Sequence, residues 1–337
     1  MLSNITQKML LKIGPEAAHD LMILGLKKTC NTPLANLYRQ DLSSKPLSVM
    51  GLKFPNRIGL AAGLDKNGEA IDAFYDMGFG HVEIGTVTPR AQPGNPKPRI
   101  FRIPEKKAII NRMGFNNQGI ERVLCNLSKK KTEGIVGINI GKNRDTPLEK
   151  STEDYLLCLD QVYPFASYVT VNISSPNTPE LRSLQFGSFL SELLSRLKER
   201  QDELANRYDR YVPLVLKIAP DLNISEIKSI SEAVLEINLD GIIATNTTVD
   251  HSPVVDFKHS KEEGGLSGAP LFESSIKVIS ALYKLLGNKI PIIGVGGIMT
   301  AEDAEKIFSS GAKLIQIYSG FIYHGPNLIK RINSLDD

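Results

Sequence analysis

Eight short runs of mostly β-branched residues alternate with helical segments from residue 57 onward, and this alternation constrains the fold more than any other feature. The runs lie at 57–62, 81–86, 135–140, 168–173, 212–218, 241–246, 291–295 and 314–318. Repeated strand–helix units imply parallel strands. Eight units over roughly 280 residues predict an α/β fold, the (β/α)8 or TIM barrel. A doubly wound sheet is the alternative.

The segments between the runs support this prediction. Helical patterns span 69–77, 119–130, 151–163, 186–208, 225–238, 272–286 and 301–310. Thr300 to Asp303 resembles a capping box at the start of the last helix. Two connections, 89–117 and 249–268, are too long for ordinary strand–helix loops. We expect the first to pass over the barrel mouth and the second to act as a lid.

Residues 1–40 stand apart from the repeats and predict a small N-terminal helical extension, with 41–337 as the barrel domain. Ile5, Met9, Leu10 and Ile13 form one apolar stripe, Pro15 suits the first turn of a second helix, and a third short piece covers 34–38. The apolar face is unusually large. It fits either a cap packed on the barrel or a surface in a membrane interface that admits an apolar ligand, and periodicity leaves both open.

Charge and hydropathy restrict the kinds of partner that we expect this chain to bind. The chain has 40 basic and 37 acidic residues among 337, a net charge of +3, which argues against a dedicated nucleic-acid surface. The sequence contains no run of about 18 apolar residues, so it predicts no transmembrane helix. The N-terminus has neither the order of a secretory signal nor the Arg- and Ser-rich composition of a transit peptide.

Cysteine and histidine spacing argues against a disulfide framework and against a metal site. Cys30, Cys125 and Cys158 lie far apart, which suits a reducing compartment. The five histidines show no ligand spacing. We therefore expect no bound metal.

In such a barrel the active site lies where the strands end. Glycine or a polar residue follows the apolar part of every run. These residues are Gly63 with Lys66, Thr86, Asn139, Asn172, Lys217, Thr245 with Asn246 and Thr247, Gly297, and Tyr318 with Ser319. The combined pattern is far more specific than any of its parts.

The loop after the fourth run is the strongest candidate for the chemistry. Residues 172–179 form a polar loop that is stiffened by two prolines and carries amides and hydroxyls, without a carboxylate, Cys or His. A hydrolase or a metal site would need those missing groups. A site that holds a flat, amide-rich molecule and takes one proton from it could use this loop.

Asparagines recur as a set at the strand ends. Asn139, Asn172, Asn177 and Asn246 each offer two donors and an acceptor oxygen, which together match a ring edge with alternating N–H and C=O groups. A single Asn there would be only a turn former. Residues 111–117 add another amide-rich loop.

The glycine run and the lysines have two interpretations each. Gly294 to Gly297 either allows a tight turn or forms a nest of N–H groups for a phosphate, completed by Tyr318 and Ser319. Lys217 either extends to solvent or supplies a fixed positive charge or a Schiff-base amine. Lys66 is either a solvated lysine at a helix start or a cation for the ligand.

Five motifs closely resemble those of the dihydroorotate dehydrogenase family, class 2, the quinone-linked bacterial type. They are GLAAGLDK at 59–66, EIGTVTP at 83–89, NRMGFNN at 111–117, NISSPNT at 172–178 and GVGGI at 294–298. The resemblance covers essentially the whole chain, including the extension. It implies oxidation of (S)-dihydroorotate to orotate in pyrimidine (UMP) biosynthesis, with FMN as cofactor.

The resemblance also implies the residues of the site. FMN would be held by Ala62, Gly63, Leu64, Asp65, Lys66, Thr86, Asn139, Asn172, Lys217, Thr245, Gly268, Gly297, Tyr318 and Ser319. Dihydroorotate would be held by Lys66, Asn111, Arg112, Met113, Gly114, Phe115, Asn172, Asn177, Asn246 and Thr247. Lys217 would stabilise negative charge on the reduced flavin.

Ser175 would be the catalytic base, which takes the C5 proton while hydride leaves C6. A serine hydroxyl is a poor base and needs a relay to water or another acceptor. Class 1 relatives have cysteine here and lack the extension, so both markers indicate class 2. Residues 1–40 would then form a tunnel for ubiquinone or menaquinone. They would also make peripheral contact with the cytoplasmic face of the cell (inner) membrane, and we expect a monomer.

Three alternatives remain at this point. Another FMN barrel oxidoreductase could act on a different pyrimidine or heterocycle, although the extension would then lack a purpose. A Schiff-base lyase could use Lys217 or Lys66. A membrane-bound binding protein would have no catalysis at all.

Overall fold

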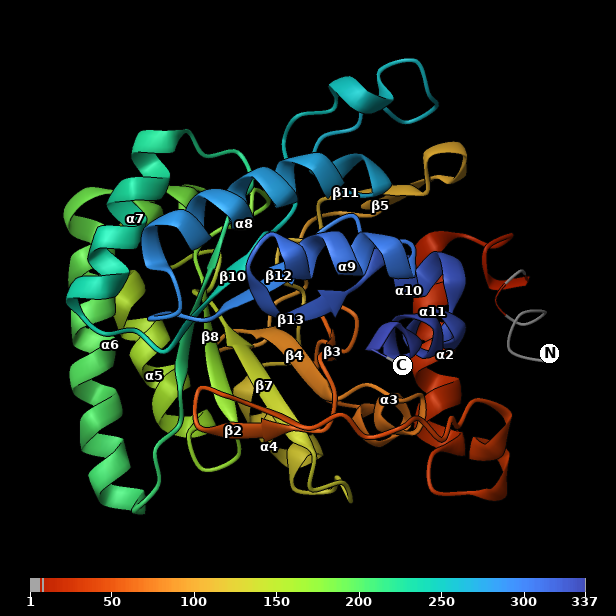
Figure 1. Cartoon of the computed structure of the whole chain (residues 1–337), viewed down its shortest axis with the longest axis horizontal. Coiled ribbons are helices and arrows are strands. Elements are labelled where there is room, and N and C mark those ends of the chain that lie inside the picture. Colours follow the sequence, from red (N-terminus) through yellow and green to blue (C-terminus); the bar gives the residue numbers. More distant parts are fainter. Residues whose placement is uncertain (1–6, 8, 337) are drawn as a thin grey trace.

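The structure is a computed structural model that describes residue 7 and residues 9–336. Eight parallel strands close into a barrel (Figure 1), which confirms the predicted (β/α)8 fold. All eight coincide with the predicted runs. They are β3 (Ile58–Leu60), β4 (His81–Val87), β7 (Ile135–Ile140), β8 (Tyr168–Asn172), β9 (Leu214–Ile218), β10 (Gly241–Ala244), β12 (Ile292–Val295) and β13 (Ala312–Ile317).

Helices surround the barrel and bury one apolar face each against it. They are α3 (Ile71–Asp76), α4 (Ile120–Leu127), α5 (Ser151–Val162), α6 (Gly187–Tyr208), α7 (Ile224–Glu236), α8 (Phe272–Leu286), α9 (Ala301–Ser309), α10 (Ser319–His324) and α11 (Pro326–Asn333). The capping box at Thr300 and Asp303 is present, and Asn223 with Glu226 forms another before α7.

Short 3-10 helices fill several connections. They are η1 (Pro33–Leu37), η2 (Pro104–Lys106), η3 (Leu148–Lys150), η4 (Leu181–Gln185), η5 (Ser252–Val254), η6 (Ala269–Leu271) and η7 (Ser334–Asp336).

The amino-terminal end of the barrel is closed by the hairpin of β1 (Leu47–Val49) and β2 (Leu52–Phe54). Phe54 and Val49 pack against barrel-interior side chains that include Tyr168, Val215 and Leu314. The interior is therefore a packed core, and polar groups at the strand ends are accessible from the carboxyl end.

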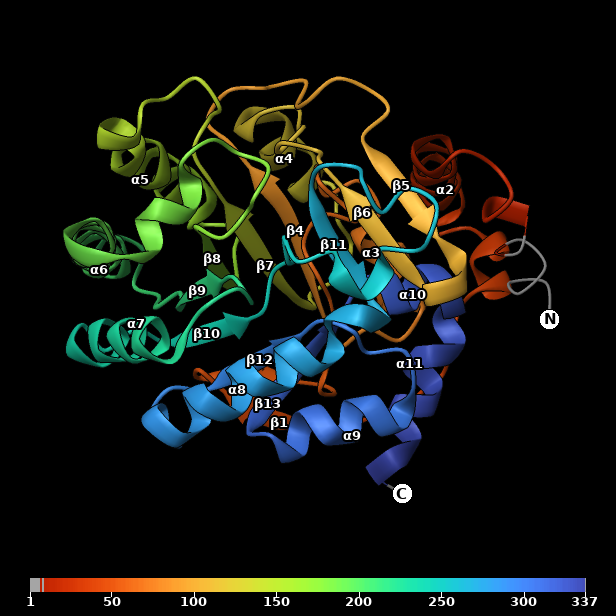
Figure 2. The same cartoon turned by 90° about the horizontal axis from the view of Figure 1, so that it is seen from above.

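The two long connections pair with each other. Residues 89–117 contain β5 (Ile100–Ile103) and β6 (Ala108–Asn111), and 249–268 ends in β11 (Gly265–Gly268). β11 pairs antiparallel with β6, and together with β5 they form a three-stranded sheet (Figure 2). The end of the predicted lid is thus a hydrogen-bonded strand.

The N-terminal extension lies beside α10 and α11 in Figure 1. Helix α2 (Pro15–Thr29) begins at the predicted proline, and η1 lies at the predicted third piece. Ile5 of the predicted apolar stripe lies outside the described residues. Ile23 and Leu26 of α2 join the main core. Six large apolar side chains of the described extension stay exposed, namely Met9, Ile13, Leu21, Leu24, Leu34 and Leu37. A domain division at residue 40 stays a prediction.

Ion pairs also attach α2 to the barrel domain. Arg99, which is 6% exposed, donates to Glu16 at 2.7 and 3.1 Å, and Lys27 contacts Glu69 at 2.9 Å. Burial alone would raise the pKa of Glu16, but hydrogen bonds from Arg99 and Lys97 lower it below its ordinary value. Within the described part of the chain, no helix is long and apolar enough to cross a membrane.

Candidate active site

A cavity with about 1020 Å³ of open space lies at the carboxyl ends of the strands. It brings together 19 of the residues predicted for the site, drawn from the ends of seven of the eight barrel strands and from the two long connections. These are Ala62, Gly63, Lys66, Thr86, Asn111, Met113, Gly114, Phe115, Asn172, Ser175, Asn177, Lys217, Thr245, Asn246, Thr247, Gly268, Gly297, Tyr318 and Ser319.

Four predicted residues do not line this cavity. Leu64 packs in the main core, and Asp65 accepts hydrogen bonds from the backbone N–H groups of Glu69 and Ala70, both at 2.8 Å. Arg112 points outward to Glu262. Asn139 is fully buried below the cavity and bonds to Glu83. These side chains stabilise the loops around the cavity and the buried layer of residues beneath it.

Ten further lining residues were not among those predicted to bind FMN or substrate, although several lie in the predicted motifs. They are Ala61, Asn116, Ser267, Leu271, Val295, Gly296, Ile298, Gln316, Ile317 and Gly320. Most are direct neighbours of predicted residues, so adjacency was the available signal. Ser267 is different, because its position depends on the pairing of β11 with β6. That pairing joins distant loops.

The cavity is positively charged. None of the described residues that line it is Asp, Glu, His or Cys, whereas Lys66 and Lys217 both reach it. Burial, with a smaller contribution from Arg99, lowers the pKa of Lys66 to about 8. Burial also lowers the pKa of Lys217, an effect that the nearby Glu83 partly offsets. No side-chain hydrogen bond of Lys217 to another described residue is present. Such a cavity suits an anionic ligand.

The loop after β8 reaches the cavity with Ser175 and Asn177. The Ser175 Oγ accepts a hydrogen bond from the Asn177 N–H at 3.3 Å, and Ser175 is 6% exposed. The Asn177 Nδ2 donates to the Asn111 carbonyl at 3.0 Å, which ties this loop to the end of β6. The predicted base and two predicted substrate ligands are therefore held in one hydrogen-bonded unit.

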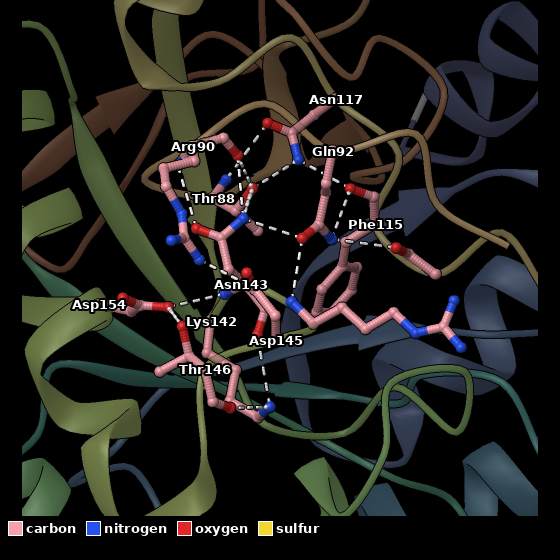
Figure 3. Close-up of polar contacts among 12 residues, drawn as sticks. Thr88, Arg90, Gln92, Phe115, Asn117, Lys142, Asn143, Asp145, Thr146 and Asp154 are labelled. Atoms are coloured by element: carbon pink, nitrogen blue, oxygen red, sulfur yellow. Dashed lines mark hydrogen bonds and ion pairs between the residues drawn. The ribbon is translucent and has the colours of Figure 1, made fainter.

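A cluster of amides holds the loop that carries Phe115 (Figure 3). Phe115 has a φ of 53°, a left-handed conformation that side chains rarely adopt. Its carbonyl accepts from Asn117 Nδ2 at 2.7 Å and from Gln92 Nε2 at 3.1 Å. Asn143 Nδ2 in turn donates to Gln92 Oε1 at 2.9 Å. These bonds stabilise the strained backbone beside the cavity.

Glycines allow two loops to approach each other at the far side of the cavity. A Cβ on Gly297 would lie 2.4 Å from the Phe272 Cα at the start of α8, and one on Gly320 would lie 2.1 Å from the Ile298 carbonyl oxygen. Only glycine fits at such distances. The loops after β12 and β13 therefore present backbone to the cavity, as a phosphate cradle requires.

A second cavity, with about 1430 Å³ of open space, lies between the extension and the barrel domain. Its lining is mostly apolar and includes Ala18, Leu21, Met22, Leu34, Leu37 and Phe321. His19 also lines it, and burial lowers the pKa of His19 to about 3, so this imidazole is neutral near pH 7.

One thin wall separates the two cavities. Gly63 and Gly320 line the first cavity, while Leu64 and Phe321, the next residues in the chain, line the second. A polar, cationic site and an apolar site thus share the backbone at the ends of β3 and β13.

Comparison with known proteins identifies the family. The family model described as dihydroorotate dehydrogenase matches residues 46–335. The chain belongs to the dihydroorotate dehydrogenase family. It is therefore an oxidoreductase, and the assignment made from its sequence motifs is confirmed.

Relatives within the dihydroorotate dehydrogenase family match almost the full chain. A protein from Shewanella denitrificans named dihydroorotate dehydrogenase (quinone) is 58% identical over 332 residues, which cover 98% of each chain. The crystal structure of DHODH from Eimeria tenella in complex with ferulenol has a TM-score of 0.88 and 37% identity, with 95% of this chain and 90% of that chain covered. The ligand-free form from the same organism has a TM-score of 0.86 and 39% identity, with 95% and 93% covered.

Proposed function

We propose that the protein oxidises (S)-dihydroorotate to orotate, with FMN as hydride acceptor and a membrane quinone as final electron acceptor, in pyrimidine biosynthesis. One observation carries the proposal: a cationic, amide-lined cavity, with no carboxylate among the described residues that line it, shares a wall with a large apolar cavity. A charged substrate and an apolar oxidant need such different environments close together. The names of the relatives support the same reaction.

The residues present fit FMN. The glycine-lined loops after β12 and β13 suit its phosphate, and Lys217 offers a buried ammonium without a hydrogen-bond partner among the described residues. Bound FMN would supply the hydride acceptor. Ala62, Thr86, Thr245, Gly268 and Tyr318 would complete the binding surface. Lys217 would place a fixed positive charge beside the ring system, where it needs no reorganisation during the reaction.

The substrate would lie between the flavin and the loop after β8. Lys66 would bind its carboxylate, and Asn111, Asn172, Asn177 and Asn246 would bind its ring amides. Ser175 Oγ would take the C5 proton, which is acidified by the adjacent carbonyl. The hydrogen bond from the Asn177 N–H to Ser175 Oγ at 3.3 Å supports this role, because it orients the hydroxyl within the loop.

The quinone would enter the apolar cavity beside α2. The exposed Leu21, Leu24, Leu34 and Leu37 would contact the membrane surface around its opening. We propose that the protein is peripheral on the cytoplasmic face of the inner membrane and acts as a monomer, with residues 1–40 as the membrane-associating unit.

Turnover of the purified protein tests the proposal. We expect a yellow protein with one FMN per chain that forms orotate from dihydroorotate with a quinone, and much less with NAD or fumarate. Orotate is measured by its absorbance and FMN by its visible spectrum. A colourless protein that binds no added FMN, or one that prefers NAD or fumarate, would overturn the proposal.

A further inference from the structure

A fully buried carboxylate lies under the cavity, inside the barrel. Glu83 of β4 has an exposure of 0% and accepts hydrogen bonds from four side chains on three other strands. The donors are Asn139 Nδ2 at 2.8 Å, Gln316 Nε2 at 2.7 Å, Tyr168 Oη at 3.0 Å and Thr170 Oγ1 at 3.1 Å. Both carboxyl oxygens of Glu83 act as acceptors in all four bonds, so each of these groups turns a donor toward it.

The hydrogen bond to Glu83 also determines how the amides of Asn139 and Asn172 are oriented between Glu83 and the cavity. Because the Asn139 Nδ2 faces Glu83, the Asn139 Oδ1 faces the other way, where it accepts from Thr86 Oγ1 at 2.5 Å and from Asn172 Nδ2 at 3.1 Å. The Asn172 Oδ1 must then face Asn246, whose Nδ2 donates to it at 3.3 Å. Reversal of either amide would place acceptor against acceptor.

The asparagine orientations at the cavity are therefore not independent choices. The same network includes Ser174, whose Oγ donates to Asn172 Oδ1 at 3.2 Å and accepts from Asn246 Nδ2 at 3.0 Å. Ser174 directly precedes Ser175. A ligand ring with alternating N–H and C=O groups requires one fixed donor–acceptor pattern at the wall, and a buried amide pair can adopt either pattern unless something selects it.

We propose that Glu83 is a positioning residue for the reaction, which fixes the amide orientations of Asn139 and Asn172 and thereby the hydrogen-bond pattern offered to the substrate. This inference rests on the proposed function. Glu83 does not line the cavity. Asn139 links it to Asn172 at the cavity wall, and Gln316, which lines the cavity, donates to its other carboxyl oxygen.

Glu83→Gln tests the proposal in the FMN-loaded protein. Glutamine has the same reach, but it can turn either its oxygen or its NH2 group toward Asn139, so two network orientations compete. We expect the orotate dissociation constant, measured from the change in flavin absorbance, to rise at least about tenfold. The rate of flavin reduction by dihydroorotate should fall by a similar factor. The FMN dissociation constant of the apoprotein gives a readout that does not depend on turnover.

Two further variants separate orientation from charge and from packing. Asn139→Leu breaks the link without changing any charge, and it should reproduce the loss of orotate affinity. Thr170→Val removes a donor from the other carboxylate oxygen and leaves the Asn139 link intact, so orotate affinity should stay within about threefold of native. Asn139→Leu also keeps the test valid should Glu83→Gln fail to fold.

A double-mutant cycle gives the deciding result. In the Asn139→Leu background, Glu83→Gln should change orotate affinity by less than about threefold, because the pathway is already broken. Fully additive losses, or native-like affinity in either single variant, would overturn the role of Glu83. A native protein that dihydroorotate does not reduce would instead overturn the proposed function, and the Glu83 role with it.

Discussion

The barrel mouth and the N-terminal extension line two adjoining cavities of opposite polarity. At the mouth, buried lysines and amides face a cavity whose described lining residues carry no carboxylate, and hydrogen bonds hold the loop after β8 and the loop that carries Phe115. In the extension, leucines stay exposed, and the adjoining cavity is mostly apolar. The first region offers specific donors and acceptors that suit a polar ligand, whereas the second offers volume and apolar surface. Under the proposed function, this difference assigns substrate oxidation to the first region and the reaction with quinone to the second.

The largest expected effect comes from removing the base at the barrel mouth. Ser175→Ala should lower the rate of flavin reduction by about 100-fold or more, because general-base catalysis contributes roughly 10²–10⁴-fold. Reoxidation by quinone should be unchanged. Ser175→Cys should recover activity as pH rises through the pKa of the thiol. Equal rates in Ser175→Ala and the native protein, measured by stopped-flow absorbance, would exclude Ser175 as the base.

A substitution in the extension should instead impair the reaction with quinone and leave flavin reduction by dihydroorotate unchanged. A Cβ on Gly25 of α2 would meet nothing within 4 Å, and Gly25 lines the apolar cavity. Gly25→Leu adds a side chain whose Cβ has room, and it should narrow this cavity and raise the KM for quinone about tenfold. The helix itself should gain up to about 1 kcal/mol of stability from the loss of glycine.

Gly25→Ala is the matched control for that variant, since it gives the same helix gain with little added volume. Its KM for quinone should stay near native. If the alanine and leucine variants raised the KM equally, volume in the apolar cavity would not govern quinone binding.

The smallest effect concerns pH and sharpens the electrostatic half of the comparison. The pKa of Lys66 is lowered to about 8, mainly by burial, so its positive charge is present below pH 8 and is lost as pH rises further. The dissociation constant of orotate should rise about fourfold between pH 7 and 8.5, as expected for one titrating cation. In Lys66→Arg, which stays charged, the dissociation constant should vary little over this range. A flat profile in the native protein would remove Lys66 from carboxylate binding.

The sequence predicted the barrel because each strand is a short apolar run followed by a helix, and both signals are local. The same locality located Lys66, Asn172 and Lys217 at the cavity, because residues after parallel strands share one end of the barrel. The Ser267 position was not predictable, since it depends on pairing between loops more than 150 residues apart.

Side-chain direction was the second feature that could not be predicted from the sequence. Asn139 ends a strand as the site residues do, yet it is buried below the cavity and bonds to Glu83. Alternation along a strand predicts which face a residue occupies, but not which of the stacked interior layers meets the ligand. Glu83 itself gave no signal as a site residue, because its role depends on four partners that are distant in sequence.

The central claim is that the two cavities divide the reaction into two separable steps. Anaerobic double mixing tests it most directly: FMN-loaded protein meets dihydroorotate first and quinone second, while flavin absorbance is followed. We expect Ser175→Ala to slow only the first phase and Gly25→Leu to slow only the second, each relative to the native protein. If either variant slowed both phases equally, or neither, the assignment of one half-reaction to each cavity would be wrong.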